Sequence, residues 1–276
     1  MIFTYKKWDV FCKKLSDFGI SSIPAREVSG IVKNYLTLKH DVETNVKKAF
    51  IIAEIEHRYG HRGSYYVQAY LLNDSENIKI LKKMQQMGHE ISYHYDVMDS
   101  NKGNIDCAIK EFEKNKQKFE KNGFDLVTVC QHGNPVVERI GYTSNRDFFR
   151  KKEVQEKYSS ISDIMVNFKE KANTEYSYFS DAGRKFKRIF DPINNDINDS
   201  SDNDVVYENL EELFKELKND GSYILSTHPH RWTKSITVYI VKTLMFKVLR
   251  FTAKIMMKIP FAKKIMSRYY YLAKKI

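Results

Sequence analysis

The sequence predicts an α/β fold in which parallel strands are flanked by helices. Strand-like apolar runs alternate with amphipathic, helix-like runs along most of the chain, and repeated units of this kind build a parallel sheet, either closed as a barrel or left open. The chain has 276 residues, of which 42% are hydrophobic. It can therefore bury a proper core as one large domain or two small ones, and it is not a disordered or low-complexity chain.

The individual elements follow from hydrophobic periodicity. Residues 7–18 are expected to form a helix with one apolar face. Seven short apolar runs are expected to be strands: 35–41, 63–69, 89–94, 125–132, 163–168, 176–181 and 222–228. Five longer amphipathic runs between them are expected to be helices: 45–59, 76–87, 104–121, 146–158 and 206–219.

Residues 193–204, with the sequence INNDINDSSDND, interrupt this alternation and have almost no apolar content. The segment lacks the Gly and the closing Glu that an EF-hand calcium loop needs. A mobile surface loop is therefore the preferred interpretation, with a calcium-binding loop as the alternative.

The net charge of +11 comes from one end of the chain. Residues 233–276 hold 11 of the 46 Lys and Arg residues and no Asp or Glu, which leaves 35 basic against 35 acidic residues in 1–232. A nucleic-acid enzyme is expected to carry its basic groove on the body of the fold, so we do not expect nucleic acid as a partner.

The basic segment has the pattern of an amphipathic helix. Its cations recur at helical spacing opposite a wide apolar face, and no apolar run is long enough to cross a bilayer. Such a helix is typical of a segment that lies on an anionic membrane surface. The alternative is a helix packed on the body or on a dimer partner, with its lysines reaching into solvent.

Cysteine content and the N-terminal sequence predict a cytoplasmic protein. Three scattered cysteines are too few for a disulfide framework, and the opening residues MIFTYKKWDVFCKK have no apolar signal-peptide core. Together with the basic segment, this predicts a protein at the inner face of the membrane.

Ionisable residues end five of the expected strands. They are His40 with Asp41, His94, His132, Asp181 and His228. The C-terminal ends of parallel strands build the ligand site of such folds, and buried His and Asp are costly unless paired or bound to metal. The pattern therefore predicts an active site at this edge of the sheet.

The first of these strand ends, LKHDVE, places two carboxylates side by side. Asp41 and Glu43 are two positions apart, so an extended chain directs them to one face and His40 to the other. One carboxylate could hold a cation while the other acts as a base toward a metal-bound water. A strand end followed by an acidic cap for the next helix is the alternative.

Five blocks of the sequence, in order, resemble the NodB-type polysaccharide deacetylases (carbohydrate esterase family 4), and in particular a subgroup found in surface-polysaccharide biosynthesis. The blocks are DVE at 41–43, GHEISYHYD at 88–96, CQHGNP at 130–135 with SNRDFFRK at 144–151, YFSDAGRKF at 178–186, and LSTHPHRW at 225–232. The resemblance implies a distorted (β/α) barrel of fewer than eight strands over residues 31–232. A helical lead-in at 1–30 would precede it, and the basic tail at 233–276 would follow.

The resemblance also implies an activity, the removal of an acetyl group from an N-acetylated sugar with the help of a divalent metal ion, for which zinc is expected. Asp41 would be the general base and His228 the acid, while Glu43 and His94 would be metal ligands. In the last two blocks, we assign substrate contacts to Asp181, Arg184 and Trp232.

One position departs from the family pattern. A second metal-binding His is expected four residues after His94, and this chain has Met98, whose thioether is a poor zinc ligand. His132 is the first candidate to replace it, because it ends the neighbouring strand. His89, which is expected to face away from His94, is interpreted as structural. The alternative function is a catalytically degenerate, membrane-peripheral module that binds glycan.

Overall fold

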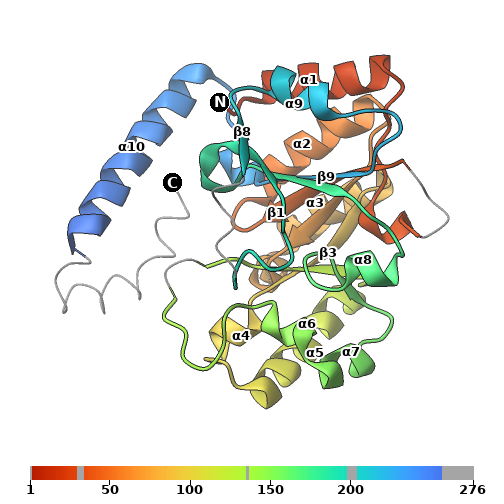
Figure 1. The fold of residues 1–276 in the computed structure, drawn as a ribbon, viewed down its shortest axis with the longest axis vertical. Coiled ribbons are helices and arrows are strands. Elements are labelled where there is room, and N and C mark those ends of the chain that lie inside the picture. The colour runs from red at the N-terminus through yellow and green to blue at the C-terminus, as the bar shows by residue number, and fades with distance from the viewer. Residues whose placement is uncertain (1, 30–33, 135–136, 198–203, 257–276) are drawn as a thin grey trace.

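The computed structural model describes residues 2–29, 34–134, 137–197 and 204–256 and shows an α/β fold around one mixed, mainly parallel sheet (Figure 1). The strand order is β5-β4-β3-β2-β1-β9-β6-β7-β8, and all neighbours are parallel except β6–β7 and β7–β8. The strands are β1 (Leu36–Val42), β2 (Gly63–Val67), β3 (Glu90–Tyr95), β4 (Thr128–Gln131), β5 (Ser162–Asp163), β6 (Ser177–Ser180), β7 (Phe186–Ile189), β8 (Val205–Tyr207) and β9 (Tyr223–Thr227).

Six of the seven expected strands are present and parallel, whereas the strand expected at 163–168 is reduced to β5 at Ser162–Asp163 and gives way to α8 from Phe168. The sheet also has two further strands. Strands β7 and β8 flank the Asn/Asp-rich segment and extend the sheet beyond β6 as an antiparallel pair. They are only four and three residues long, so neither carries a clear alternating pattern. Within the described residues, the sheet therefore has nine strands rather than fewer than eight, and its edge strands β5 and β8 do not pair with each other.

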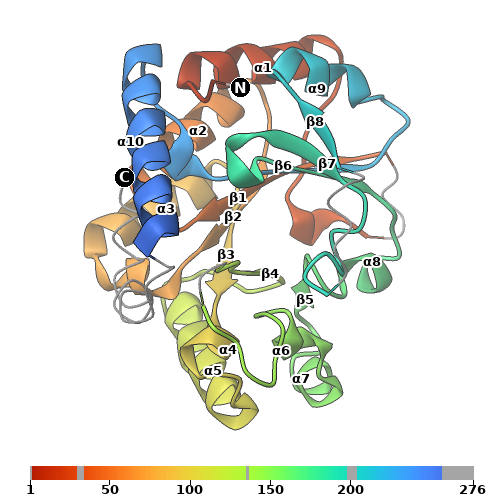
Figure 2. The same ribbon diagram turned by 60° about the vertical axis from the view of Figure 1, so that its left-hand side comes forward.

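The helices cover the sheet, as Figure 2 shows. They are α1 (Tyr5–Asp17), α2 (Val46–Arg58), α3 (Ser75–Gln86), α4 (Val97–Ser100), α5 (Ile105–Lys121), α6 (Asp147–Arg150), α7 (Lys152–Lys157), α8 (Phe168–Lys171), α9 (Leu210–Glu216) and α10 (Ile236–Met256). The helix expected at 146–158 is divided at Lys151, whose backbone is extended. The helix expected at 206–219 begins at Leu210, because the Asn209 side chain caps it by accepting the N–H of Glu212.

The N-terminal helix is part of the main core. Trp8, Phe11, Cys12 and Leu15 are buried on its inner face, as their helical spacing predicts. Thr4, just before the helix, forms a bridge with Thr233, so the two ends of the body are tied together.

Strand β1 lies near the middle of the sheet and is buried along its whole length. Leu36 and Leu38 face the core beneath the helices. His40 points to the same side, where its Nε2 lies 2.8 Å from Glu56 Oε1 on α2. Lys39 and Asp41 alternate with these residues and face the other side of the sheet. The expectation that His40 and Asp41 point in opposite directions is confirmed.

Glu56 is the centre of a buried polar cluster on the helix side of β1. Its carboxylate accepts hydrogen bonds from Trp8 Nε1 (3.1 Å) and Tyr65 Oη (2.8 Å), and it faces His40. Burial raises the pKa of Glu56, but His40 and its other partners outweigh burial and leave that pKa below its ordinary value. The cluster connects α1, α2, β1 and β2 and contributes to the fold rather than to the strand-end site.

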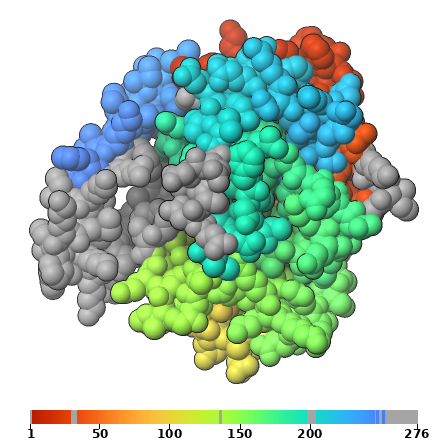
Figure 3. Space-filling model, viewed as in Figure 1, coloured from red at the N-terminus to blue at the C-terminus, as the bar shows by residue number. Residues whose placement is uncertain are grey.

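Helix α10 runs along one side of the molecule and lies at its margin in the space-filling view (Figures 1 and 3). Tyr239 is buried near Phe3 and anchors its first turn to the body. Further along, apolar side chains are exposed, namely Val241, Leu244, Val248 and Phe251. None of the described helices is both long and apolar enough to cross a membrane. Residues 257–276 of the expected amphipathic tail lie outside the described residues.

Candidate active site

The site begins with a carboxylate and a buried lysine on β1. Lys39 Nζ donates hydrogen bonds to both carboxylate oxygens of Asp41, each at 2.6 Å, and to Ser226 Oγ on β9 at 3.1 Å. Lys39 is 1% exposed and Asp41 is 7% exposed. The sequence analysis missed Lys39, although the same alternation that pairs Asp41 with Glu43 also directs Lys39 to that face.

The lysine keeps Asp41 ionised. Burial raises the pKa of Asp41, but the Lys39 ammonium, with smaller effects from His94 and His228, outweighs burial and leaves that pKa below its ordinary value. Burial likewise lowers the pKa of Lys39, and Asp41 reverses this effect and raises it well above the usual value. Asp41 is therefore a carboxylate at neutral pH, held in one orientation.

Next to Asp41, three further side chains from separate strand ends form a group that can hold a metal ion. The ligand atoms of Glu43, His94 and His132 all lie within 4.8 Å of one another. His132 Nε2 lies 3.3 Å from Glu43 Oε1, and the rings of His94 and His132 are edge to face at 5.2 Å. The structure thus brings together the residues that the sequence analysis assigned to the metal, including His132.

The chemistry of this donor set fits a zinc-type ion. His94 Nδ1 lies 3.1 Å from the Cys130 carbonyl oxygen, so its proton is held there and Nε2 keeps the lone pair. Burial, with the nearby His132, lowers the pKa of His94 to about 3, so the ring is neutral at neutral pH. Two imidazoles and one carboxylate form the three-protein-ligand set of hydrolytic zinc sites. Met98 does not take part, because it is buried in the core.

A second group of possible ligands consists of Asp41, His94 and Cys130, and it shares His94 with the first. Burial raises the pKa of the Cys130 thiol well above its ordinary value. Asp41 is also already engaged by Lys39. The Glu43–His94–His132 group is therefore the better metal site.

His228 faces these residues from the end of β9. Its Nε2 lies 3.7 Å from Asp41 Oδ2 and 3.9 Å from Glu43 Oε1. Its Nδ1 lies 2.5 Å from Asp181 Oδ1, and its backbone N–H donates to Oδ2 of the same carboxylate. Arg231 also donates to Asp181. Asp181 therefore fixes the orientation of the His228 ring and leaves Nε2 directed at the site.

Two of the three substrate contacts expected from the sequence are wrong. Asp181 and Trp232 are both 0% exposed. Asp181 is fully engaged by Thr227, His228 and Arg231, and Trp232 Nε1 donates to Thr227 Oγ1 within the core. Trp232 thus packs behind the site rather than against a sugar. Arg184, the third expected contact, is half-buried.

Two other buried histidines, His89 and His61, have structural contacts. His89 Nδ1 accepts the Gly63 N–H and its Nε2 contacts the Ala53 carbonyl, which confirms the interpretation from the sequence. His61 is buried and contacts the Cys12 carbonyl through Nε2, whereas His57, four residues earlier, is exposed. These two histidines therefore do not form a metal pair.

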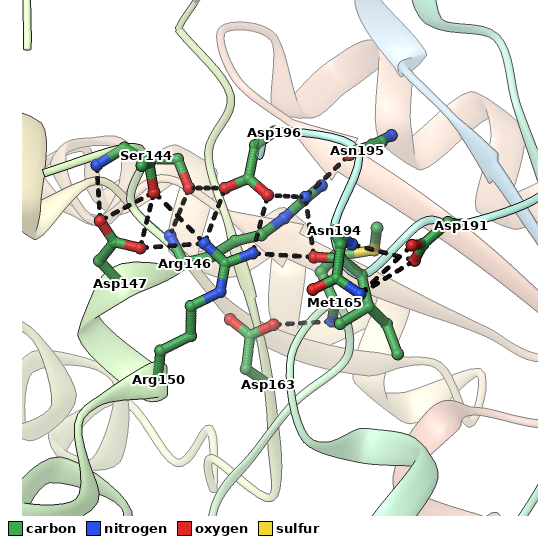
Figure 4. Close-up of polar contacts among 12 residues, drawn as sticks. Ser144, Arg146, Asp147, Arg150, Asp163, Met165, Asp191, Asn194, Asn195 and Asp196 are labelled. Atoms are coloured by element: carbon green, nitrogen blue, oxygen red, sulfur yellow. Dashed lines mark hydrogen bonds and ion pairs between the residues drawn. The ribbon is translucent and has the colours of Figure 1, made fainter. Parts of the chain in front are cut away.

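Loop residues 193–197 are held in place by an ionic clasp, shown in Figure 4. Asp196 Oδ1 accepts hydrogen bonds from Arg146 (2.8 Å) and Arg150 (2.7 Å), and Ser144 donates to its other oxygen. Both arginines also donate to the Ile193 carbonyl. The clasp joins the β7–β8 connection to the β4–β5 connection, so the expected mobile loop is docked at 193–197. Residues 198–203 lie outside the described part.

Asp196→Asn is expected to lower the free energy of unfolding by about 2 kcal/mol, because Arg146, which is 5% exposed, would lose its charged partner. Burial raises the pKa of Asp196, but the arginines and Ser144 outweigh it and lower that pKa strongly. The stabilisation is therefore present above pH 3.8 and lost as the pH falls below it. Urea titration measures the difference. The matched control Asp125→Asn, at an exposed position, should leave the free energy of unfolding unchanged. An equal loss of unfolding free energy in both variants would contradict the stabilising role of the clasp.

Stability of the metal-free protein is expected to fall as the pH drops below 6.5. Burial lowers the pKa of His89 to about 4, and the pKa values of His94 and His230 to about 3, from 6.5. The unfolded chain therefore binds more protons than the folded one in this range, which favours unfolding. Urea titrations between pH 6.5 and pH 4 measure the fall in unfolding free energy, and the number of protons taken up on unfolding can be measured over the same range. A stability that stays flat over the range would show that these rings are protonated in the folded protein.

Comparisons with known proteins find similarity among solved structures. No protein-family model and no curated protein sequence matches the chain. A mutant of BA3943, described as a carbohydrate esterase family 4 pseudoenzyme with restored enzymatic activity, has a TM-score of 0.42 at 12% identity over 80% of this chain and 64% of its own length. The wild-type BA3943 from Bacillus anthracis has a TM-score of 0.41 at 12% identity, over 79% and 61%. The Bc1960 peptidoglycan N-acetylglucosamine deacetylase has a TM-score of 0.37 at 16% identity, over 71% and 72%. The chain is thus similar in structure, at low identity, to carbohydrate esterase family 4 proteins. Its match covers less than two thirds of the length of the mutant and wild-type BA3943 chains.

Proposed function

We propose that this chain is a metal-dependent amide hydrolase that removes the acetyl group from an N-acetylated sugar of a surface polysaccharide or its lipid-linked precursor. The observation that carries the proposal is that three groups of functional side chains lie together at one edge of the sheet. These are the metal-binding group Glu43, His94 and His132, the ionised carboxylate of Asp41, and the oriented imidazole of His228. The order of the five sequence blocks supports the same family and fold.

Each residue has a role that its surroundings favour. Asp41, kept ionised by Lys39, takes the proton of the attacking water. His228 delivers a proton from Nε2 to the departing nitrogen, and Asp181 stabilises the imidazolium through Nδ1. A divalent ion held by Glu43, His94 and His132 would supply Lewis-acid activation of the amide carbonyl and of the water, and zinc fits these donors.

The sheet is proposed to be a distorted barrel of the NodB type. Seven parallel strands form its main part, and β7 and β8 extend one edge. The clasp between Asp196 and the two arginines connects the loops beyond the two edges, which supports closure by side chains where backbone pairing is not made.

Helix α10 and the basic tail are proposed to hold the protein on the anionic inner face of the cytoplasmic membrane. Four exposed apolar residues of α10 and the absence of acidic residues from sequence positions 233–276 support this role. Packing of Tyr239 against the body shows that the first turn of α10 is also structural. Deletion of residues 257–276 is expected to abolish binding of the protein to anionic vesicles. Unchanged vesicle binding would contradict the membrane role.

Acetate release from N-acetylglucosamine oligosaccharides, measured with Zn²⁺ present, tests the proposed activity. Wild type and the exposed-site control His57→Ala should both release acetate, whereas His228→Ala should be slower by about 10²–10⁴-fold. The second candidate, a degenerate glycan-binding module, is favoured by Met98 at the position of the usual second His. It predicts saturable sugar binding without acetate release in any of these proteins, and that result would overturn the enzyme assignment.

A further inference from the structure

A groove lies between α1, α9 and the start of α10, which Figures 1 and 2 show gathered at one end of the molecule. Its volume of about 740 Å³ is typical of small-molecule sites, and its lining is mostly apolar. Phe11 and Leu210 are buried in it, at 3% and 8% exposed, whereas Val10 and Ile236 line it and remain about half exposed. The groove shares no residue with the strand-end site.

Helix α1 forms one wall of the groove and α9 forms another. Lys7, Val10 and Lys14 follow one another at intervals of three and four positions, so they share one face of α1. Lys14 Nζ donates a hydrogen bond to Glu211 on α9 and lies 4.3 Å from the centre of the Phe214 ring. This ion pair therefore bridges the two helices and neutralises Glu211.

Backbone pairing holds the start of α10 beside the groove. Thr4, which also lines the groove, forms a bridge with Thr233, and the Tyr5 N–H donates to the Thr233 carbonyl at 3.0 Å. Lys234 and Ile236 follow directly in the chain and are both part of the lining. Their placement thus rests on hydrogen bonds between the two ends of the body.

Positive charge is in excess around the groove. Its lining contains one acid, Glu211, and four lysines, namely Lys6, Lys7, Lys14 and Lys234. Because Lys14 pairs with Glu211, three cations remain, and their ammonium groups have no hydrogen bond or ion pair within the described residues. All three side chains are exposed. An apolar floor with free cations around it matches a ligand that has both an apolar chain and an anionic group.

The exposed apolar side chains of α10 continue from this groove. Ile236, which lines the groove, is followed at helical spacing by other exposed residues, namely Ile240, Leu244, Val248 and Phe251. The two apolar surfaces are therefore continuous. A free anion would leave the apolar floor unused, whereas a lipid molecule uses the floor, the lysines and the adjoining row together.

We propose that this groove binds an anionic phospholipid, with an acyl chain on the apolar floor and the headgroup phosphate at the three free lysines. Lysine ammonium groups bind phosphate as point charges, and burial of the chain adds hydrophobic stabilisation. The site is independent of the proposed hydrolase activity. It adds a specific lipid contact to the membrane role that is proposed for α10 and the basic tail.

Calorimetric titration of the full chain with monomeric dihexanoyl-phosphatidylglycerol tests the groove without a bilayer. Wild type is expected to bind it saturably, and Lys7→Gln and Lys234→Gln are each expected to weaken binding by about fivefold through loss of one cation beside the headgroup. Val10→Gln should weaken binding by a similar factor of about five, because it removes an apolar contact with the chain.

Two matched controls separate the groove from general surface effects. Lys215→Gln removes the same charge from an exposed position of α9, and Val127→Gln removes an exposed valine. Neither residue lines the groove, so both variants should bind the lipid as wild type does.

Absence of saturable binding, or equal weakening by Lys215→Gln, would overturn the proposed site. Equal affinity for dihexanoyl-phosphatidylcholine would contradict the selection of an anionic lipid. Equal affinity for glycerol 3-phosphate, which has the anion without the chains, would contradict the role of the apolar floor. If deletion of residues 257–276 leaves vesicle binding unchanged while the short-chain lipid still binds, the membrane role of the tail fails and the groove stands.

Discussion

Asp41→Asn is expected to abolish most acetate release and to destabilise the fold at the same time. The amide cannot accept a proton from water, so kcat should fall by about 10²–10⁴-fold. It also leaves the Lys39 ammonium, which is 1% exposed, without an anionic partner. Removal of one member of a buried ion pair costs about 3–5 kcal/mol in unfolding free energy, measured by urea titration.

The double variant Lys39→Met, Asp41→Asn separates the two effects. Removing both charges should restore much of the stability lost in Asp41→Asn, because no uncompensated buried charge remains. Activity should stay as low as in Asp41→Asn. Recovery of activity in the double variant would show that Asp41 is a structural partner of Lys39 rather than the base.

Glu56→Ala is expected to destabilise the protein by about 3–5 kcal/mol without changing the strand-end site directly. Trp8, His40 and Tyr65 would lose their common acceptor in a fully buried position. Glu54→Ala, at an exposed position on the same helix, is the matched control and should change the unfolding free energy by less than about 0.5 kcal/mol.

The Glu56 effect should depend on pH. The pKa of Glu56 is lower in the folded protein than its ordinary value of 4.5, so its stabilisation is present above pH 4.5 and is lost as the pH falls through the folded value. The difference between wild type and Glu56→Ala in urea should therefore shrink in acid. A difference that is constant from neutral pH into acid would mean that Glu56 is protonated in the fold.

The strand-end site could be predicted because two simple periodicities control it. Parallel strands bring their C-terminal ends to one edge, and this places His94, His132 and His228 together from distant parts of the chain. The twofold alternation of a strand separates Asp41 from His40. Neither inference requires knowledge of side-chain packing.

Packing decides what the sequence analysis missed. Asp181 and Trp232 lie in the last two blocks of the resemblance, where substrate contacts were expected, yet both are buried and support His228 and Thr227 instead. Lys39 and Glu56 are charged residues in otherwise apolar runs, and their burial depends on partners from strands and helices far away in the sequence. Such partners cannot be identified from spacing alone.

The departure from the family pattern at Met98 has a structural explanation. Helix α4 begins two residues after β3 and directs Met98 into the core, so this position cannot reach the site. His132 reaches the same group from the end of β4, with its backbone N–H held by the Tyr95 carbonyl at 2.7 Å. In the proposed site, a ligand from the next strand would therefore take the place of one from the following helical turn.

Calorimetric titration of the metal-free protein with Zn²⁺ tests this exchange of ligands most directly. Wild type and the exposed-site control His57→Ala should bind Zn²⁺ tightly and in a near-stoichiometric ratio. Both His94→Ala and His132→Ala should lose this tight binding. Retention of wild-type affinity by His132→Ala would contradict the Glu43–His94–His132 site, and with it the proposed metal-dependent hydrolase.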